Sequence, residues 1–445
     1  MKYPSQALGI LADDLTGACD TALQFFNAGS EATVLLDYKA VDPNRTEGTW
    51  VVNTDSRHLE QYDAIAAVKK SAHFLIENFG IDCFYKKLDS TFRGHVAQEC
   101  LALLDELRWK ACVIAPAYPE QDRKTIGGYQ LVGGIPLELT DAARDPLFPV
   151  RQSSLLGILG AQSSPNIVYH IPFSTVVHGA GPIKKALVEA IQMGKKLIVV
   201  DACADVDLEQ LALAITLMPA ETPVLPCGSA GLAKAITKRW VHRDVDFDDD
   251  ERPDTLSLPP RPILLVMGSM HSTSRLQIET LLQHARDYNL RGDIELIKLT
   301  AGHLLGQSPL TSVTEQARQA LMSGKNIVLC SSFPYTLVEE TAQLAEALSI
   351  DSTQLPAVIT EVLSKIAEEV LKDCPAHLVL SGGETANGVC RAMGSRRLAL
   401  LGQLETSITL AEDQEKRYVV TKSGGFGDRM TLLNVIKQLE ELSEA

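Results

Sequence analysis

Short apolar runs alternate with amphipathic stretches along most of the chain. Runs that predict buried strands in the first half lie at residues 7–12, 32–36, 50–54, 83–88, 112–115, 196–200 and 224–225. Helical spacing is found at residues 16–26, 62–79, 96–107 and 183–193. The second half continues in the same way, with strands expected at residues 263–267, 294–299, 327–329 and 378–380. This alternation predicts an α/β fold with mostly parallel sheets flanked by helices.

Two stretches interrupt the alternation. Residues 243–261 are rich in aspartate and proline, and charge repulsion together with proline disfavours regular structure, so we expect an acidic linker there. The linker divides the 445 residues into an N-terminal domain, 1–242, and a C-terminal domain, 262–445, with the active site expected in the cleft between them. Residues 118–165 combine several glycines and prolines with polar residues, which is typical of a functional loop or lid.

Three turns in the C-terminal half combine small residues with the end of an apolar run. They are Gly268-Ser269, Ser381-Gly382-Gly383 and Ser423-Gly424-Gly425, and Glu384 and Thr385 follow the second turn at the start of a helix-compatible stretch. Free N–H groups at a helix start attract phosphate, and ligands of parallel sheets bind where the strands end. Each turn alone could be a simple strand-to-helix connection, but three on one edge of a sheet indicate a nucleotide site.

Charged residues follow the apolar runs of the N-terminal half in the same manner. Asp13 and Asp14 end the first run, and two carboxylates there are costly to bury unless something binds them, although one could simply cap the next helix. Arg57 follows a second run. Lys87, Asp89, Ser90 and Arg93 crowd a third strand end, where a surface ion-pair patch is the alternative interpretation. Arginine forms bidentate hydrogen bonds with carboxylates, so this set of residues suits a ligand that carries a carboxylate and hydroxyl groups.

Composition and motifs exclude several other classes. A net charge of −15 argues against a nucleic-acid or anionic-membrane surface. No apolar run approaches the about 20 residues of a membrane span. The nine cysteines form no C-x-x-C pair, so we expect reduced thiols and a cytoplasmic protein. The sequence contains no G-x-S-x-G, H-E-x-x-H or G-x-x-x-x-G-K-[ST] motif, and no clear G-x-G-x-x-G follows the first strand.

Taken together, the chain resembles the four-carbon acid sugar kinases. The residues that carry the resemblance are Ala12 to Gly17, Lys87 to Gly94, Ala115-Pro116-Ala117, Gly268-Ser269, Ser381 to Thr385, Lys422-Ser423-Gly424 and Phe426-Gly427-Asp428. The resemblance implies an N-terminal domain that binds a sugar acid and a C-terminal domain that binds ATP. It further implies that Asp14, Arg57 and Lys87-Leu88-Asp89-Ser90 hold the acid, whereas Ser269, Gly382 to Thr385 and Gly424 hold ATP.

The sequence therefore predicts an ATP-dependent kinase that phosphorylates the terminal C4 hydroxyl of D-threonate or D-erythronate. Asp13 or Asp14 is the expected base, with Asp89 second, and Lys87 and Arg93 are expected to hold the carboxylate or the transferring phosphoryl group. Mg²⁺ is expected with ATP, while its ligands and a homodimeric assembly stay open. The alternative acceptors are 3-oxo-tetronate and L-threonate. A sugar-acid sensor and an NAD-linked sugar-acid oxidoreductase are the alternatives from other classes.

Overall fold

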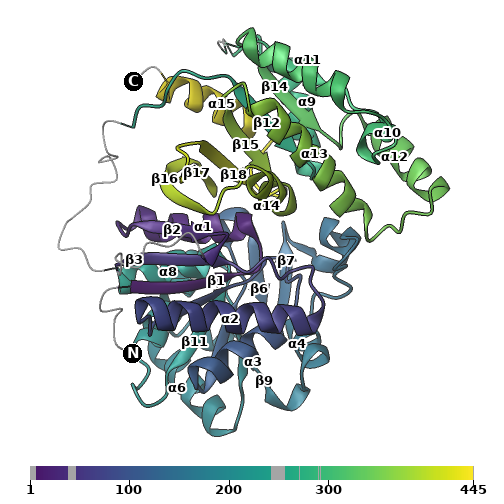
Figure 1. Ribbon diagram of the computed structural model, residues 1–445. Helices are drawn as coiled ribbons and strands as arrows, with labels where there is room; N and C mark the ends of the chain where they lie inside the picture. Colours follow the sequence, from purple (N-terminus) through teal and green to yellow (C-terminus); the bar gives the residue numbers. More distant parts are fainter. Residues whose placement is uncertain are drawn as a thin grey trace. The chain divides into compact units, whose positions relative to one another are not determined.

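The computed structural model describes residues 7–38, 47–241, 256–269, 271–288, 290 and 292–443. The chain divides into two compact units, Met1–His242 and Arg243–Ala445 (Figure 1). Each unit alternates strands and helices around a sheet, which confirms the predicted α/β class. Residues 243–255 of the expected linker lie outside the described residues. Its last part packs on the second unit, because Leu258 is buried and its N–H donates to the carbonyl of Leu442 at 2.8 Å.

The N-terminal unit is built on a parallel sheet with the strand order β2-β3-β1-β4-β11-β5-β10-β9. Its strands are β1 (Ala7–Ala12), β2 (Ala32–Leu35), β3 (Gly48–Asn53), β4 (Phe84–Lys87), β5 (Ala111–Ala115), β9 (Val168–Ile171), β10 (Leu197–Val200) and β11 (Val224–Gly228). The central strands are buried on both faces, as continuous apolar runs require.

Helices cover both faces of this sheet. They are α1 (Leu15–Asn27), α2 (Gln61–Phe79), α3 (Val96–Leu107), α4 (Leu155–Gln162), α5 (Phe173–Val176), α6 (Ala180–Gln192), α7 (Asp205–Thr216) and α8 (Ala230–Trp240). Helices α1, α8, α7 and α6 pack against one another in succession. Helices α2, α3 and α4 form a second row (Figure 1). Strand β1 therefore leads into one row through α1, whereas its neighbour β4 leads into the other through α3.

The glycine-rich stretch after residue 118, for which the sequence predicts a functional loop or lid, contains a small sheet. Strands β6 (Arg123–Ile126), β7 (Tyr129–Val132) and β8 (Ile135–Pro136) pair antiparallel. Gly127 and Gly128 join the first two strands with φ of 62° and 76°, and a two-residue turn of this kind needs positive φ at both positions. Both glycine N–H groups donate to the buried carboxylate of Asp201, which fixes the hairpin to the end of β10.

The C-terminal unit has the strand order β13-β14-β12-β15-β18-β17-β16. Its strands are β12 (Ile263–Met267), β13 (Ile294–Ile297), β14 (Asn326–Cys330), β15 (His377–Ser381), β16 (Arg397–Glu405), β17 (Ile408–Asp413) and β18 (Tyr418–Lys422). Pairing is parallel from β13 to β18, while β17 pairs antiparallel with β18 and with β16.

Helices of this unit also form two layers. They are α9 (Ser272–His284), α10 (Ala301–Leu304), α11 (Thr311–Met322), α12 (Tyr335–Ala347), α13 (Leu355–Leu371), α14 (Gly383–Ala392) and α15 (Thr431–Leu442). Helices α9 and α15 pack together over one apolar core, and α13 packs against α11 and α14. Strand β12 leads into α9, whereas its neighbour β15 leads into α14, so the two connections leave toward different layers.

Each sheet therefore has a point where neighbouring strands send their connections to opposite faces. In the N-terminal unit this point lies between β1 and β4, and in the C-terminal unit between β12 and β15. Such a point leaves a crevice at the carboxyl ends of the two strands, where ligands of open α/β sheets bind. Asp13 and Gly382 follow β1 and β15 directly, and Asp89 and Ser269 come one residue later after β4 and β12.

We predict that Gly128→Ala weakens the hairpin because alanine disfavours positive φ, and its Cβ would lie 3.2 Å from Leu156. The expected loss is about 1–2 kcal/mol of unfolding free energy. Gly181→Ala is the control, since Gly181 lies in α6 and a Cβ there would meet open space. That variant should be neutral or stabilised by up to about 1 kcal/mol. Urea unfolding measures the unfolding free energy of both variants. Equal changes in the two would contradict the assignment of Gly128 to a turn that needs positive φ.

Candidate functional site

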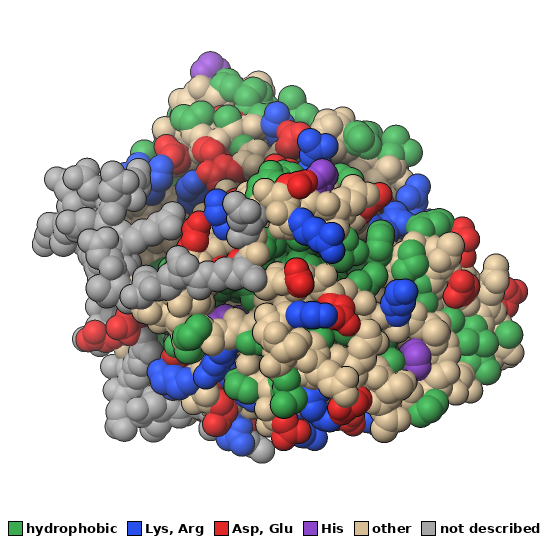
Figure 2. Space-filling view, turned by 90° about the horizontal axis from the view of Figure 1, so that it is seen from above, with side chains coloured by type: hydrophobic (Ala, Val, Ile, Leu, Met, Phe, Trp, Pro, Cys, Tyr) green, Lys and Arg blue, Asp and Glu red, His purple; other side chains and the backbone are tan. Residues whose placement is uncertain are grey.

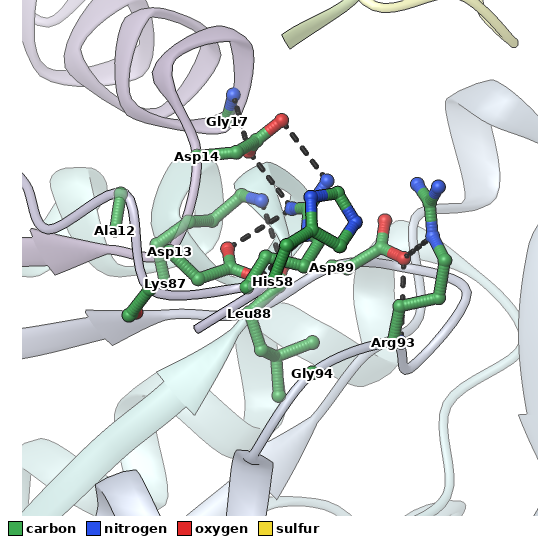
Figure 3. A network of polar contacts seen from close by, with 12 residues as sticks. Ala12, Asp13, Asp14, Gly17, His58, Lys87, Leu88, Asp89, Arg93 and Gly94 are labelled. Carbon is green, nitrogen blue, oxygen red and sulfur yellow. Dashed lines mark hydrogen bonds and ion pairs between the residues drawn. The ribbon is translucent and has the colours of Figure 1, made fainter. Parts of the chain in front are cut away.

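Figure 3 shows the two aspartates that follow β1, Asp13 and Asp14, and Arg57 binds both of them. Its Nε and Nη2 donate to the two oxygens of Asp13 at 2.8 and 3.0 Å, and its Nη1 donates to Asp14 at 3.0 Å. Burial alone would raise the pKa of Asp13, but the charge and hydrogen bonds of Arg57, with Lys86 and Lys87 nearby, lower it. Asp13 is therefore an ionised carboxylate whose two oxygens are both occupied.

Asp14 has the capping role that the sequence left as an alternative. It is the N-cap of α1, and its Oδ1 accepts a hydrogen bond from the N–H of Gly17 at 3.0 Å. Its Oδ2 accepts from the hydroxyl of Thr16 at 2.9 Å. Asp14 is less buried than Asp13, yet both of its oxygens also face Arg57. The helix start and the Arg57 contact thus hold this carboxylate in one orientation.

Asp89 and Arg93 form a second ion pair after β4. Nε of Arg93 donates to Oδ2 of Asp89 at 2.6 Å, and Nη1 of Arg93 donates to Asp145 at 2.9 Å. Burial opposes ionisation of Asp89, but the charges of Arg93 and Arg57 and the hydrogen bonds from Arg93 and Thr91 hold its pKa well below the usual value. All hydrogen bonds that Asp89 accepts from described residues go to Oδ2, so Oδ1 stays available to a ligand.

The two lysines of β4 have different surroundings. Lys86 is buried and pairs with Glu99 at 2.8 Å, and Glu99 also accepts from Ser56 at 2.6 Å. Burial opposes the charge of Lys86, but Glu99 raises its pKa above the usual value. Lys87 is also buried, yet within the described parts of the chain its Nζ donates only to the carbonyl of Leu88, at 2.7 Å.

Lys87 therefore carries a buried ammonium group that forms no ion pair with a described carboxylate. Its Nζ lies close to the first turn of α1, since a Cβ at Gly17 would be 2.8 Å away. A buried charge of this kind is costly unless a ligand supplies its partner. Lys87 is thus the residue of this set that points most directly to an anionic ligand.

Leu88 and Ser90 contribute through the backbone. The side chain of Leu88 is buried in the apolar core, so only its carbonyl, which binds Lys87, takes part in the polar cluster. The carbonyl of Ser90 accepts a hydrogen bond from the side chain of Gln130 at 2.9 Å. The structure thus brings together at β1 and β4 all of the residues that the sequence proposed for the acid.

The hairpin adds two residues that sequence analysis missed. Gln130 is buried in β7 and holds the loop at Ser90. Arg123 is buried in β6. Burial lowers its pKa, although the negative charges of Asp89, Asp122 and Asp20 act to raise it. The signal was present in the sequence, because Gly127-Gly128 is a pair of glycines between the two short runs Arg123–Ile126 and Tyr129–Val132, and such a pair is typical of a two-residue hairpin turn.

All nine cysteines lie in described parts of the chain, and all are free thiols, eight of them buried. The Sγ atoms of Cys100, Cys112 and Cys227 lie within 4.8 Å of one another. Burial raises the pKa of Cys112 and of Cys227 well above the usual value, so these two thiols are protonated at neutral pH. They act as small apolar side chains in the core behind Lys86.

In the C-terminal unit the three small-residue turns meet at β12, β15 and β18. A Cβ at Gly424 would clash with the hydroxyl of Ser269, and one at Gly382 would lie 3.4 Å from the Cβ of Ser269. A Cβ at Gly425 would lie 2.8 Å from Nε2 of His271. The turns thus pack so closely that side chains would collide, and only small residues let the three strand ends share one edge.

Helix α14 starts at this edge without a side-chain cap. Its N-cap is Gly382, with φ of 101°, a value that glycine adopts without strain. The hydroxyl of Thr385 accepts from the N–H of Gly268 at 3.2 Å and so ties the helix to the end of β12. The hydroxyl of Ser381, next to the helix start, is buried and has no hydrogen-bond partner among the described residues. An uncapped helix start beside a buried hydroxyl suits an anionic group.

The surface adds little to this picture. On the part of the face in Figure 2 that the structure describes, basic and acidic side chains are interspersed. None of the described helices is long and apolar enough to cross a lipid bilayer.

Comparison with known proteins gives the family. A model described as a sugar-binding N-terminal domain matches residues 8–236, and one described as a nucleotide-binding C-terminal domain matches residues 264–432. A D-threonate kinase of Salmonella typhimurium is 29% identical over 443 residues, which cover 97% of this chain and 98% of that protein. A D-erythronate kinase of Heliobacterium modesticaldum is 28% identical over 411 residues, 87% of this chain and 85% of that protein. The chain belongs to the four-carbon acid sugar kinase family.

Other members of this family carry a different substrate in their names. Several relatives at 24% to 26% identity are named 3-oxo-tetronate kinase. A solved structure from Salmonella typhimurium, described as a putative tRNA synthase, has the same fold, with a TM-score of 0.75 at 20% identity over 97% of this chain and 99% of that one. Family membership thus agrees with the resemblance seen in the sequence and leaves the acceptor open.

We predict that Glu99→Gln destabilises the N-terminal unit by about 3–5 kcal/mol, because it leaves the buried ammonium of Lys86 without its charged partner. Asp105→Asn is the matched control on the same helix, since it removes an exposed ion pair with Lys69. That variant should unfold at the same urea concentration as the wild type. A Glu99→Gln protein as stable as the control would show that the buried pair contributes little.

Proposed function

We propose that this chain transfers the γ-phosphoryl group of ATP to the terminal hydroxyl of D-threonate or D-erythronate. The observation that carries the proposal is the match of both units to the two domains of one kinase family, each with polar residues at the crevice of its own sheet. Relatives that span nearly the whole chain are named for these two acids, which supports the choice of acceptor. The location of the reaction between the two units stays a prediction.

Lys87 is the proposed partner of the substrate carboxylate. The described cations around it are already committed, since Arg57 binds Asp13 and Asp14, and Arg93 binds Asp89 and Asp145. Of these three cations, Lys87 is the one that forms no ion pair with a described carboxylate, since its Nζ donates to the carbonyl of Leu88. Binding a carboxylate there would replace the solvation that its ammonium group has lost on burial.

Asp89 is the proposed group that orients and deprotonates the acceptor hydroxyl. Asp13 and Asp14, which the sequence ranks first, have every oxygen engaged by Arg57 or by the start of α1. The carboxylate of Asp89 is ionised, and its Oδ1 accepts no hydrogen bond from described residues. It can therefore accept a hydrogen bond from the acceptor hydroxyl and take up the proton that this hydroxyl loses. Kinase catalysis consists mainly of such positioning together with charge neutralisation, so a strongly basic group is not required.

The C-terminal unit is the proposed ATP site. Ser269, Gly382 to Thr385, Gly424 and Gly425 surround the uncapped start of α14, where backbone N–H groups and the helix dipole favour phosphate. Mg²⁺, when bound with ATP, would neutralise part of the charge of the phosphates. Asp428 fits as its protein ligand, because its Oδ1 accepts from Met430 and Thr431 while its Oδ2 accepts no hydrogen bond from described residues.

The test is phosphoryl transfer from ATP with Mg²⁺ to D- and L-threonate, D- and L-erythronate and the 3-oxo-tetronates. Coupled ADP release gives the rate, and phosphorus NMR locates the phosphate. We expect turnover on D-threonate or D-erythronate with the phosphate on the terminal oxygen. Turnover restricted to a 3-oxo-tetronate or to L-threonate would correct the acceptor. ATP binding without turnover on any acid would favour a sensor.

We predict that Asp89→Asn lowers kcat by about 100-fold or more, because the amide cannot accept the hydroxyl proton. The affinity for ATP, measured by titration calorimetry, should not change. Asp14→Asn is the matched variant, since asparagine also caps a helix well and should cost less than about tenfold. A larger loss in Asp14→Asn than in Asp89→Asn would assign the base to Asp14 instead.

A further inference from the structure

Lys422 is a fully buried lysine in the C-terminal unit, and the proposed chemistry does not use it. It ends β18, and its exposed fraction is 0%. Its Nζ donates to the carbonyls of Ser423 at 2.9 Å and Gly424 at 3.4 Å. These are its only side-chain hydrogen bonds within the described parts of the chain, and they leave its charge without a carboxylate partner. A buried lysine of this kind needs an explanation, because unpaired ammonium groups are rare in protein cores.

The position of Lys422 connects it to the proposed phosphate site. Ser381 is its register partner on β15, and their side chains point to the same face of the sheet, where the hydroxyl of Ser381 has no partner among the described residues. The carbonyl of Lys422 accepts from the N–H of Gly382, the N-cap of α14. Lys422 therefore lies against both the glycine turn that follows it and the start of the uncapped helix.

The same turn is also held from α9. The hydroxyl of Ser274 donates to the carbonyl of Gly424 at 2.8 Å, so Ser274 and Lys422 share one acceptor. Gln277 donates to the carbonyls of Phe426 and Asp428 at 3.1 and 2.7 Å. These hydrogen bonds to the carbonyls fix the peptide groups of the turn. The strength of the bonds that Lys422 donates depends on the charge state of its amino group.

We propose that Lys422 is a positioning residue of the nucleotide site that takes up a proton from solvent when the phosphates bind. In the free protein the ammonium group has only carbonyl dipoles for partners. Bound phosphate adds negative charge at the adjacent turn and so favours the protonated lysine, whose hydrogen bonds then hold Ser423 and Gly424 in place. By the same linkage, protonation of Lys422 tightens nucleotide binding. This inference rests on the proposed nucleotide site.

The surroundings of Lys422 agree with this coupling. Burial lowers its pKa to about 7, and no charged neighbour contributes to the shift. The elements that hold the turn carry charged or titratable groups, namely His271, Arg275, Glu279 and His284 on α9, Glu384 and Arg391 on α14, and Asp428 before α15. On β15, β17 and α9 the residues against it are uncharged, namely Ser381, Ile408 and Ser274.

The test is titration calorimetry of the β,γ-imido analogue of ATP with Mg²⁺ and no sugar acid, in buffers of different ionisation enthalpy. The variant is Lys422→Met, and the difference from wild type removes any proton exchanged by the nucleotide itself. At pH 8 we expect wild type to take up about 0.9 proton more per nucleotide than the variant, because a group with a pKa of about 7 is then mostly neutral. At pH 6 the difference should fall to about 0.1 proton.

Lys87→Met is the matched control. Lys87 is also a buried lysine at a strand end whose Nζ donates to the next carbonyl, but it lies in the other unit. It should take up protons on nucleotide binding as wild type does. Nucleotide binding with equal proton uptake in wild type and Lys422→Met would overturn this inference alone. Failure of wild type to bind the nucleotide would overturn the proposed nucleotide site and the inference with it.

Thermal unfolding without ligand covers the case in which Lys422→Met binds poorly because its fold is altered. The pKa of Lys422 is lower in the folded than in the unfolded chain, so the lysine costs stability below pH 7 and less as pH rises toward 10.5. The melting temperature of Lys422→Met should therefore exceed that of wild type by most at pH 6 and by least at pH 9. A difference in melting temperature that does not vary with pH would show that Lys422 is not a buried titrating group.

Discussion

The hydrogen bonds from Arg57 to Asp13 and Asp14 are the interaction on which the N-terminal site depends. Three charged groups meet at the end of a buried strand, where each alone would be costly to remove from water. Because Arg57 satisfies both carboxylates, two aspartates can directly follow β1, and the second of them can cap α1. Asp89 and Arg93 repeat the arrangement after β4, which leaves Lys87 as the cation without a described carboxylate partner.

The two units place their polar residues at the same point of the sheet but use different types of residue there. In each sheet, neighbouring strands send their connections to opposite faces, and the crevice between them collects the polar residues. The N-terminal crevice is lined by ionised side chains, which suits a small acid with hydroxyl groups. The C-terminal crevice is lined by glycine turns and a helix start, which suits phosphate. Phosphoryl transfer requires mainly that two such sites hold their ligands firmly, because the metal ion and the positioning supply most of the rate.

Much of this could be predicted from the sequence. Apolar runs such as 7–12 and 378–380 became β1 and β15, because a strand buried on both faces must be apolar throughout. The polar strand ends were also visible, since parallel strands bring their carboxyl ends to one edge. The hairpin at Gly127-Gly128 was not foreseen, because its strands are short and only half buried. The antiparallel pair β16 and β17 was missed as well.

The roles within the site were harder to predict than its members. The sequence shows that Asp13, Asp14 and Asp89 are present, but the free oxygen on each depends on where Arg57 and Arg93 reach. Likewise Lys86 and Lys87 are adjacent in sequence, yet only Lys86 meets Glu99, from a helix formed by a later stretch. Partners that are distant in the chain decide which charge is neutralised and which is left for a ligand.

The most direct test of this account is a crystal structure with the four-carbon acid and a non-hydrolysable ATP analogue bound together. We predict the acid at the ends of β1 and β4, with its carboxylate on Lys87 and a terminal hydroxyl within hydrogen-bond distance of Oδ1 of Asp89. The analogue should place its phosphates at the start of α14. An acid bound elsewhere, or one that turns its hydroxyl away from Asp89, would contradict the account.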